Sequence, residues 1–166
     1  CEFADPRAVM RPGVRLAVDV GTVRVGLARS DAGAVLALPL QTLTRQDDAS
    51  ELDEIARIAG ELDAIEIIVG LPRHMQGGEG ISAKGARRYA RKIKMALPAC
   101  RVCLVDERLS SHEGHERLLQ AGVGRREHRQ MIDQVAASII LETALEMERM
   151  SGQAPGREIV LEEGQR

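Results

Sequence analysis

Acidic residues occur at three places where the surrounding apolar pattern predicts that side chains point inward. Asp19 lies within the run VRLAVDVG, Asp106 and Glu107 close a second apolar run, and Asp133 lies at the start of an apolar helix. A buried carboxylate is costly unless it is paired or binds a metal. Three carboxylates that meet at one sheet edge could supply oxygen ligands for Mg²⁺ or Mn²⁺. The alternative is that Asp19 pairs with an arginine or caps a turn.

The adjacent residues Asp106 and Glu107 pose a choice, because neighbours on an extended strand point to opposite faces of a sheet. Only one of them can easily join Asp19. Parity along the strand does not settle which one, since the phase between the two strands depends on the register. Glu107 has the longer side chain and can reach a metal from a strand end. It is the preferred ligand, with Asp106 as the alternate.

Charge is distributed unevenly along the chain, although the net charge is only −2. Acidic residues dominate positions 46–66, whereas positions 81–97 carry cations and no acidic residue. A basic segment attracts phosphate, so it predicts a contact with nucleic acid; the alternative is a solvated face paired with the acidic helix. The cations of the basic segment are Lys84, Arg87, Arg88, Arg91, Lys92 and Lys94.

Alternating and helical apolar patterns predict the elements that position these residues. Two short strands joined by a tight turn, and then AVLALPLQTL, indicate three successive antiparallel strands. A helix from Ser50, the buried strand AIEIIVGLP, a glycine-rich loop at 74–80, the basic helix and a strand at 101–105 follow. A helix capped by Ser110 and a long helix over roughly 129–150 complete the order. We therefore predict an α/β fold with a central mixed five-stranded sheet, three antiparallel strands and then parallel strands, flanked by helices.

Length and composition limit the class of protein. A chain of 166 residues with 44% hydrophobic and 29% charged residues fits one globular domain. We expect residues 1–13 to be a tag remnant or a disordered start, 14–150 to form the domain, and 151–166 to be a flexible tail. No apolar run approaches the roughly 20 residues that span a bilayer, and no signal-peptide pattern occurs. We expect a cytoplasmic protein that does not contact membranes.

Cysteine and aromatic residues exclude some chemistries. Cys100 and Cys103 form a CxxC, but no second pair or histidine cluster completes a zinc site, and the pair leads into a strand. Phe3 and Tyr89 are the only aromatic residues, which argues against aromatic stacking platforms for single strands. The motifs also contain no Ser/His/Asp or Cys/His arrangement, so a reaction without a protein nucleophile is expected.

Taken together, the motifs resemble the YqgF/RuvX family. The resemblance covers most of the chain, from Leu16 to about Glu146, with the motifs in the right order. It implies a ribonuclease H-like fold related to the RuvC Holliday-junction resolvase. The matching segments are DVGTVRVG at 19–26, IIVGLP at 67–72, the loop glycines, DERLSS at 106–111 and IDQVAASIILE at 132–142.

The resemblance implies that Asp19, Glu107 and Asp133 form a metal-binding catalytic set. Members of the family are described as Holliday-junction resolvases and as nucleases that mature the 5′ end of the precursor of 16S ribosomal RNA. We therefore expect a nuclease that hydrolyses phosphodiester bonds in structured nucleic acid with two Mg²⁺ or Mn²⁺ ions. The expected partner is pre-rRNA or branched DNA, and a homodimer is a further expectation.

Three other residues of the motif regions have less certain roles. Arg108 is predicted to contact nucleic acid, and Ser110 to cap a helix, although an ion pair explains Arg108 equally well. The family's GLP motif is commonly followed by Asn two residues on, where this chain has His74. We interpret His74 as a loop residue rather than a catalytic base.

Two other functions fit parts of the sequence. The pattern DxGT followed by glycine also begins the phosphate loop of the actin, Hsp70 and sugar-kinase superfamily. Those proteins need two such domains, and this chain is too short for two and lacks a second DxGG motif. The other alternative is a catalytically inactive nucleic-acid-binding or regulatory protein of the same fold. A cleavage assay would separate it from a nuclease.

Overall fold

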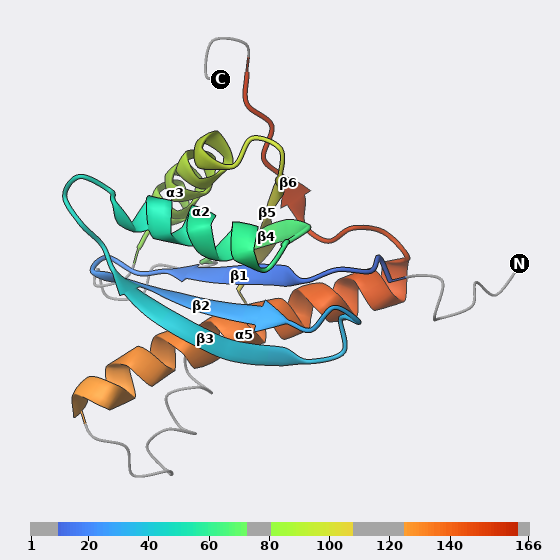
Figure 1. Ribbon diagram of the computed structural model, residues 1–166, viewed down its shortest axis with the longest axis horizontal. Coiled ribbons are helices and arrows are strands. Elements are labelled where there is room, and N and C mark those ends of the chain that lie inside the picture. Colours follow the sequence, from blue (N-terminus) through green and yellow to red (C-terminus); the bar gives the residue numbers. More distant parts are fainter. Residues whose placement is uncertain (1–9, 73–80, 108–124, 163–166) are drawn as a thin grey trace, which may run out of the picture.

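The fold consists of one mixed sheet with helices on both faces (Figure 1). The computed structural model describes residues 10–72, 81–107 and 125–162. α2 and α3 cover one face of the sheet, and α5 crosses the other face (Figure 1). The described elements are β1 (Arg15–Val20), β2 (Arg24–Ser30), β3 (Ala37–Thr44), α2 (Glu51–Glu61), β4 (Glu66–Leu71), α3 (Ala83–Ala96), β5 (Arg101–Asp106), α5 (Arg125–Ser151) and β6 (Arg157–Glu158).

The strands lie in the order β3-β2-β1-β4-β5-β6. β1, β2 and β3 are antiparallel neighbours, whereas β4 lies parallel to β1 and β5 parallel to β4. This arrangement confirms the predicted mixed α/β sheet. The strand number is corrected from five to six, because β6 pairs antiparallel with β5. A strand of two residues is too short to produce a period in the sequence.

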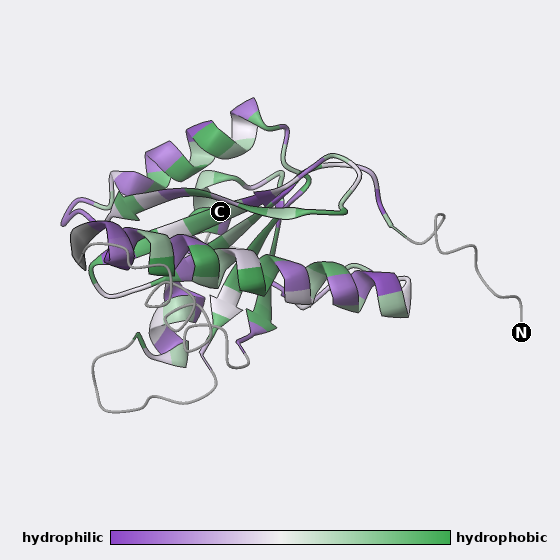
Figure 2. Cartoon of the chain, turned by 90° about the horizontal axis from the view of Figure 1, so that it is seen from below, coloured by the Kyte–Doolittle hydropathy of each residue, from purple (hydrophilic) through white to green (hydrophobic). Residues whose placement is uncertain are grey.

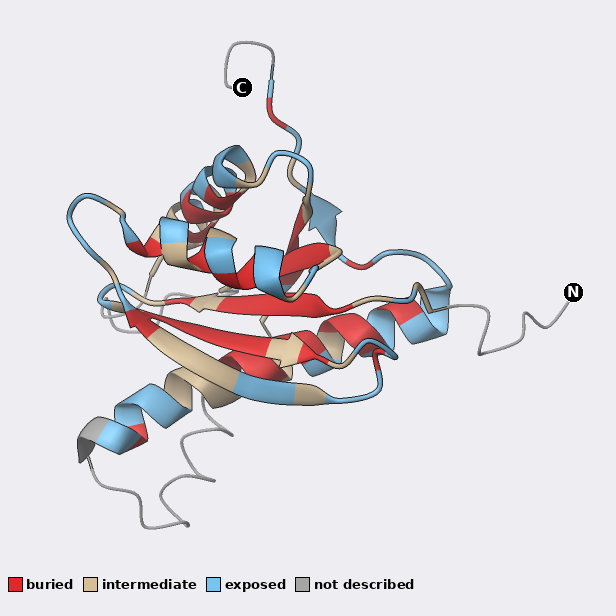
Figure 3. Ribbon diagram, in the orientation of Figure 1, coloured by how far each residue is buried: buried red, intermediate tan, exposed pale blue. Residues whose placement is uncertain are grey.

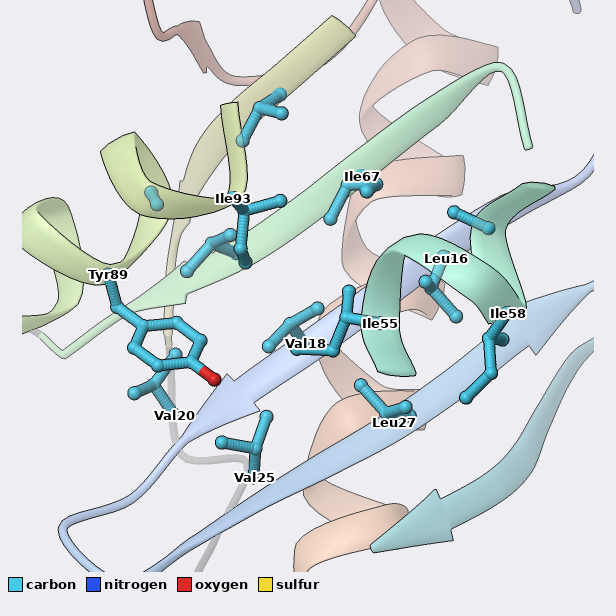
Figure 4. Close-up of a cluster of buried hydrophobic side chains, with 14 of the residues drawn as sticks. Leu16, Val18, Val20, Val25, Leu27, Ile55, Ile58, Ile67, Tyr89 and Ile93 are labelled. Carbon is cyan, nitrogen blue, oxygen red and sulfur yellow. The ribbon is translucent and has the colours of Figure 1, made fainter. Parts of the chain in front are cut away.

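Both faces of the central strand β1 are buried, so its sequence is almost continuously apolar (Figure 3). On one face, Leu16 and Val18 pack with Ile55 of α2 and Tyr89 of α3 (Figure 4). On the other face, Ala17 packs against α5. In Figure 2, which views the molecule from below, α5 lies across the strands and carries both hydrophilic and hydrophobic residues. Asp19 continues the second face, so its carboxylate points to the α5 side of the sheet.

The helix α3 connects two parallel strands and therefore begins at the sheet edge where the strands end. Its first turn is capped by Ser82, whose hydroxyl accepts a hydrogen bond of 3.0 Å from the backbone N–H of Gly85. This direction places the first cations of α3 nearest the carboxyl ends of β4 and β5. No helix within the described residues is long and apolar enough to cross a membrane.

Charged residues are buried at the opposite, amino-terminal edge of the sheet. Arg15, Glu66 and Glu148 are each at most 1% exposed. Arg15 donates to Glu148 at 2.5 Å, and Arg11 pairs with both glutamates. Arg101 completes this amino-edge network with a contact of 2.6 Å to Glu66. The expectation that residues 1–13 lie outside the fold is therefore wrong for Arg11.

The segment after α5 also differs from the expected tail. β6 pairs with β5, and the backbone N–H of Ile159 donates to the carbonyl of Val102 at 2.7 Å. Leu161 is only 7% exposed, and the carbonyl of Pro155 accepts a hydrogen bond from Arg101. Residues 155–161 are thus attached to the edge of the sheet. The attachment depends mainly on backbone hydrogen bonds, which leave no signal in the sequence.

Candidate active site

The strand register places Asp19 and Glu107 on the same face of the sheet. Ala17 of β1 lies opposite Ile68 of β4, which lies opposite Cys103 of β5. Paired residues point to the same face, and so do residues two positions further along each strand. Asp19 lies two positions after Ala17, and Glu107 lies four positions after Cys103. Both side chains therefore belong to the face that α5 covers.

Asp106 lies in the opposite phase and is exposed. The structure thus brings Glu107, and not the alternate Asp106, toward Asp19. The backbone N–H of Glu107 donates to the carbonyl of Leu71 at 2.8 Å, which continues the pairing of β5 with β4 by one residue. Because this hydrogen bond extends the strand pairing, the side chains of β5 still alternate between the two faces of the sheet as far as Glu107.

The carboxyl groups of Asp19, Glu107 and Asp133 are close enough to affect one another. Asp19 lies at the sheet edge with some exposure, but protein surrounds its carboxyl group. Burial raises the pKa of Asp19 well above its ordinary value, and the charge of Glu107, a hydrogen bond with Glu107 and the charge of Asp133 raise the pKa further. The three residues come from β1, from the end of β5 and from α5, and they form the carboxylate cluster of this chain.

Two glycines provide the space for the carboxylate cluster. Gly26 lies opposite Asp19 in the sheet, and a Cβ atom built on Gly26 would be 2.0 Å from the carbonyl oxygen of Asp133. A Cβ atom on Gly70 would be 2.6 Å from Oε1 of Glu107 and 2.4 Å from Cδ1 of Ile140. Any other residue at Gly26 would push α5 away from β2. The absent side chains therefore set how closely the three carboxylates approach.

Arg24 is a charged neighbour of the carboxylate cluster that the sequence analysis did not identify. It lies two residues before Gly26 and so on the same face, and its Nε donates to Oδ2 of Asp133 at 2.7 Å. Both side chains are partly exposed, at 31% and 19%. The signal was present in the motif DVGTVRVG, because Asp19, Arg24 and Gly26 share one face once the two strands form a hairpin.

The turn between β1 and β2 is held in place from the α3 side. The N–H of Gly21 donates to the carbonyl of Arg24 at 2.8 Å, and Nη1 of Arg45 donates to the Gly21 carbonyl at 3.0 Å. The Arg45 guanidinium also lies 4.9 Å from the ring centre of Tyr89, whose hydroxyl donates to Glu51. Gly21 is thus required by the tight turn itself, where a Cβ atom would be 2.7 Å from the Arg24 carbonyl oxygen.

The donor atoms of the carboxylate cluster are all oxygens, which suits a hard divalent cation such as Mg²⁺ or Mn²⁺. Asp19 and Glu107 would hold such an ion, and Asp133 could join them if Arg24 released its carboxylate. With the side chains as they stand, no three acidic, imidazole or thiol groups among residues 10–72, 81–107 and 125–162 form a closed metal cluster. The chemistry of the oxygen donors fits such an ion.

The basic face of α3 does not pair with the acidic helix α2, although the two helices are neighbours. In the part of the chain that the structure describes, no ion pair joins them. Arg57 of α2 instead pairs within its own helix, with Glu54 and with Glu61. Lys84, Arg88, Arg91 and Lys92 are exposed, whereas Arg87 and Lys94 are partly buried. His74, Arg108 and Ser110 lie outside the described residues.

Comparison with known proteins now gives the family. The sequence model of the RuvX family, described as Holliday junction resolvase, matches residues 13–147. The chain belongs to the RuvX family. This family membership makes the chain a nuclease, that is, a hydrolase of phosphodiester bonds. It confirms the resemblance that the sequence motifs indicated.

Relatives from Kineococcus and Streptomyces match nearly the whole chain. A protein of Kineococcus radiotolerans is 47% identical over 159 residues, which cover 95% of this chain and 84% of the relative. A protein of Streptomyces coelicolor is 42% identical over 147 residues, which cover 89% of this chain and 88% of the relative. Both relatives are provisionally named pre-16S rRNA nuclease.

Solved structures of RuvC share the fold. T. thermophilus RuvC in complex with a Holliday junction substrate superposes with a TM-score of 0.55 and 14% identity, over 86% of this chain and 99% of RuvC. A second Thermus thermophilus RuvC structure gives a TM-score of 0.52 and 15% identity, again over 86% of this chain and 99% of RuvC. At this level of identity the similarity establishes the ribonuclease H-like fold and nothing further.

Proposed function

We propose that this RuvX protein is a metal-dependent nuclease that cleaves structured nucleic acid at the carboxylate cluster. The observation that carries the proposal is the convergence of Asp19, Glu107 and Asp133 on one face at the carboxyl edge of the sheet. These residues are 26 or more positions apart in the sequence. Burial raises the pKa of Asp19 most, and the nearby Glu107 and Asp133 raise that pKa further. Such mutual repulsion favours the binding of a cation.

Two divalent ions at such a site would activate a water molecule and stabilise the leaving oxygen of the scissile phosphate. The carboxylates would hold and orient the ions, and Gly26 and Gly70 let α5 and Glu107 come close enough to do so. Arg24 pairs with Asp133 at 2.7 Å and would be within reach of a substrate phosphate held at the cluster. No residue of the protein needs to act as the nucleophile.

The exposed cations of α3 are the proposed contact for the nucleic-acid backbone. They begin at the same sheet edge as the carboxylate cluster and are not neutralised by α2. The name of the relatives favours pre-16S rRNA as the substrate, with cleavage that matures its 5′ end. The description of the family favours a four-way DNA junction as the second candidate. A homodimer stays a prediction.

A cleavage assay with precursor RNA and a four-way DNA junction side by side, in Mg²⁺ or Mn²⁺, tests the proposal. Asp19→Asn and Glu107→Gln should abolish cleavage while the fold stays as stable as the wild type or more stable, because each removes charge repulsion. Asp106→Asn is the matched control and should keep activity, since Asp106 is exposed and in the opposite phase.

Two results would contradict the proposal. Cleavage retained by correctly folded Asp19→Asn protein would rule out the carboxylate cluster as the catalytic centre. Loss of activity in the Asp106 variant alone would show that the wrong carboxylate had been assigned. If the wild type binds both substrates and cleaves neither with either metal, the chain is an inactive nucleic-acid-binding protein of the same fold.

A further inference from the structure

A groove of about 780 Å³ lies along the outer edge of β5. β6 pairs with β5 only at Cys103 and Leu104, so Val105 and Asp106 extend beyond the end of β6. α3 contributes Arg87 to the groove, and α5 contributes side chains from the other face of the sheet. Figure 1 shows these two helices on opposite sides of β5. The groove is therefore formed where the sheet edge is left uncovered by β6.

One end of the groove lies where β4 and β5 end, next to the residue that carries the Glu107 carboxylate, although Leu71 and Asp106 point to the opposite face of the sheet. Leu71 and Asp106 line its end, and the carbonyl of Leu71 accepts the backbone hydrogen bond of Glu107. From that end the lining continues along β5 to Leu104 and to Arg157 of β6. The groove therefore begins within one residue of Glu107 along the chain.

The charges that line the groove suit phosphate. Arg87 and Arg157 both line it, and within the described ranges neither forms an ion pair. Glu158, the acidic neighbour of Arg157, is the next residue of β6 and therefore points to the other face, where it approaches Arg101 at 4.0 Å. Asp106 is the one acidic lining residue in the described part of the chain, and it lies at the end nearest the carboxylate cluster.

We propose that this groove binds a single-stranded segment of the nucleic-acid substrate, with Arg157 and Arg87 contacting its phosphates. The volume is of the size that holds small ligands (~300–1,000 Å³). A volume of this size can hold a few unpaired nucleotides. Aliphatic side chains such as Leu104 and Met147 give the bases an apolar surface, and guanidinium planes can stack on them where aromatic residues are absent.

This inference rests on the proposed function and narrows its substrate. A nuclease that trims an RNA end has an unpaired strand to hold, whereas a fully paired four-way junction has none. The groove therefore favours a substrate with a single-stranded extension over a junction. Arg157 lies in a segment that the sequence analysis assigned to a tail, so no nucleic-acid contact was predicted there.

Equilibrium binding of two RNA duplexes to the full chain tests the groove. One duplex is blunt and the other carries a single-stranded extension of about six nucleotides, within the range that one binding module holds. Binding is measured by fluorescence anisotropy, and divalent ions are left out of the buffer to prevent cleavage. We expect Arg157→Ala to weaken binding of the extended duplex roughly three- to tenfold and to lower its salt slope by about 0.7, with no effect on the blunt duplex. Arg157→Lys should retain most of the affinity.

The matched control is Arg57→Ala, which removes one exposed arginine from α2 and should change neither affinity. Arg157→Ala protein that binds the extended duplex as tightly as the wild type would refute the groove, and so would equal weakening for both duplexes. Melting temperatures of the variants identify any loss of folding. If Arg157→Ala protein is unfolded, the affinity of Arg157→Lys protein for the extended duplex tests the groove instead. Wild-type protein that binds neither duplex would instead overturn RNA as the substrate of the proposed function.

Discussion

The close approach of α5 to β2 at Gly26 gives a sharp prediction for the substitution Gly26→Ala. The new Cβ atom would lie 2.0 Å from the carbonyl oxygen of Asp133 and 2.3 Å from its carbonyl carbon. Cβ atoms in proteins essentially never come within 3.0 Å of such an atom, so the separation must grow by at least about 1 Å. Both atoms belong to the helix backbone, so no side-chain rotation relieves the clash.

The expected cost in stability follows from that movement. Overpacking of a core typically costs about 1–3 kcal/mol, which corresponds to a fall in melting temperature of roughly 2–12 °C for a domain of this size. The same movement carries Asp133 away from Asp19 and Glu107. A misplacement of about 1 Å can reduce a rate about 100-fold, so cleavage should fall by that order even where the protein remains folded.

Gly60→Ala is the matched control, because it makes the same chemical change where a Cβ atom meets nothing within 4 Å. Gly60 is an exposed residue of α2, so alanine should leave cleavage unchanged and stabilise the protein by about 0.5–1 kcal/mol. Differential scanning calorimetry and the cleavage assay measure both effects. If Gly26→Ala protein melts and cleaves like the wild type, the argument that Gly26 sets the position of Asp133 is wrong.

Two other predictions concern charge. Glu148→Gln leaves the buried Arg15 without a charged partner and Arg11 with Glu66 alone. Because Glu148 is 1% exposed, this should cost about 3–5 kcal/mol, measured by denaturant unfolding; a loss below about 1 kcal/mol would contradict it. The double substitution Arg88→Ala with Lys92→Ala on α3 should weaken nucleic-acid binding and lower the salt slope by about two units, one for each lost contact. The control double substitution, Arg57→Ala with Arg149→Ala, removes two exposed arginines elsewhere, and an equal effect of both pairs would point to bulk charge alone.

The carboxylate cluster was predicted from the sequence because a carboxylate inside an apolar run is a local anomaly. The choice between Asp106 and Glu107 was not predictable from parity, since it depends on the register of β1, β4 and β5, which is set by long-range pairing. The family resemblance favoured Glu107, and the register now agrees with that preference.

The missed features share a physical cause. Arg24 meets Asp133 across 109 residues, and Arg11 meets Glu148 across 137. Contacts of that range leave no periodic pattern, and a polar residue at such a position is indistinguishable in sequence from a solvated one. β6 escaped prediction for a different reason, because two residues held by backbone hydrogen bonds carry no side-chain signature.

The long helix α5 has a consequence for the protein while it is being synthesised. Asp133, the third carboxylate, and Glu148, which neutralises Arg15 of the central strand, both lie on this last helix of the described domain. A nascent chain that has emerged only as far as β5 has Arg15 without Glu148 and Asp19 without Asp133. In such a chain the charge of Arg15 is not balanced by Glu148, and the carboxylate cluster is incomplete. Under the proposed function, a chain released before α5 has been made would lack Asp133 and should therefore be inactive as a nuclease.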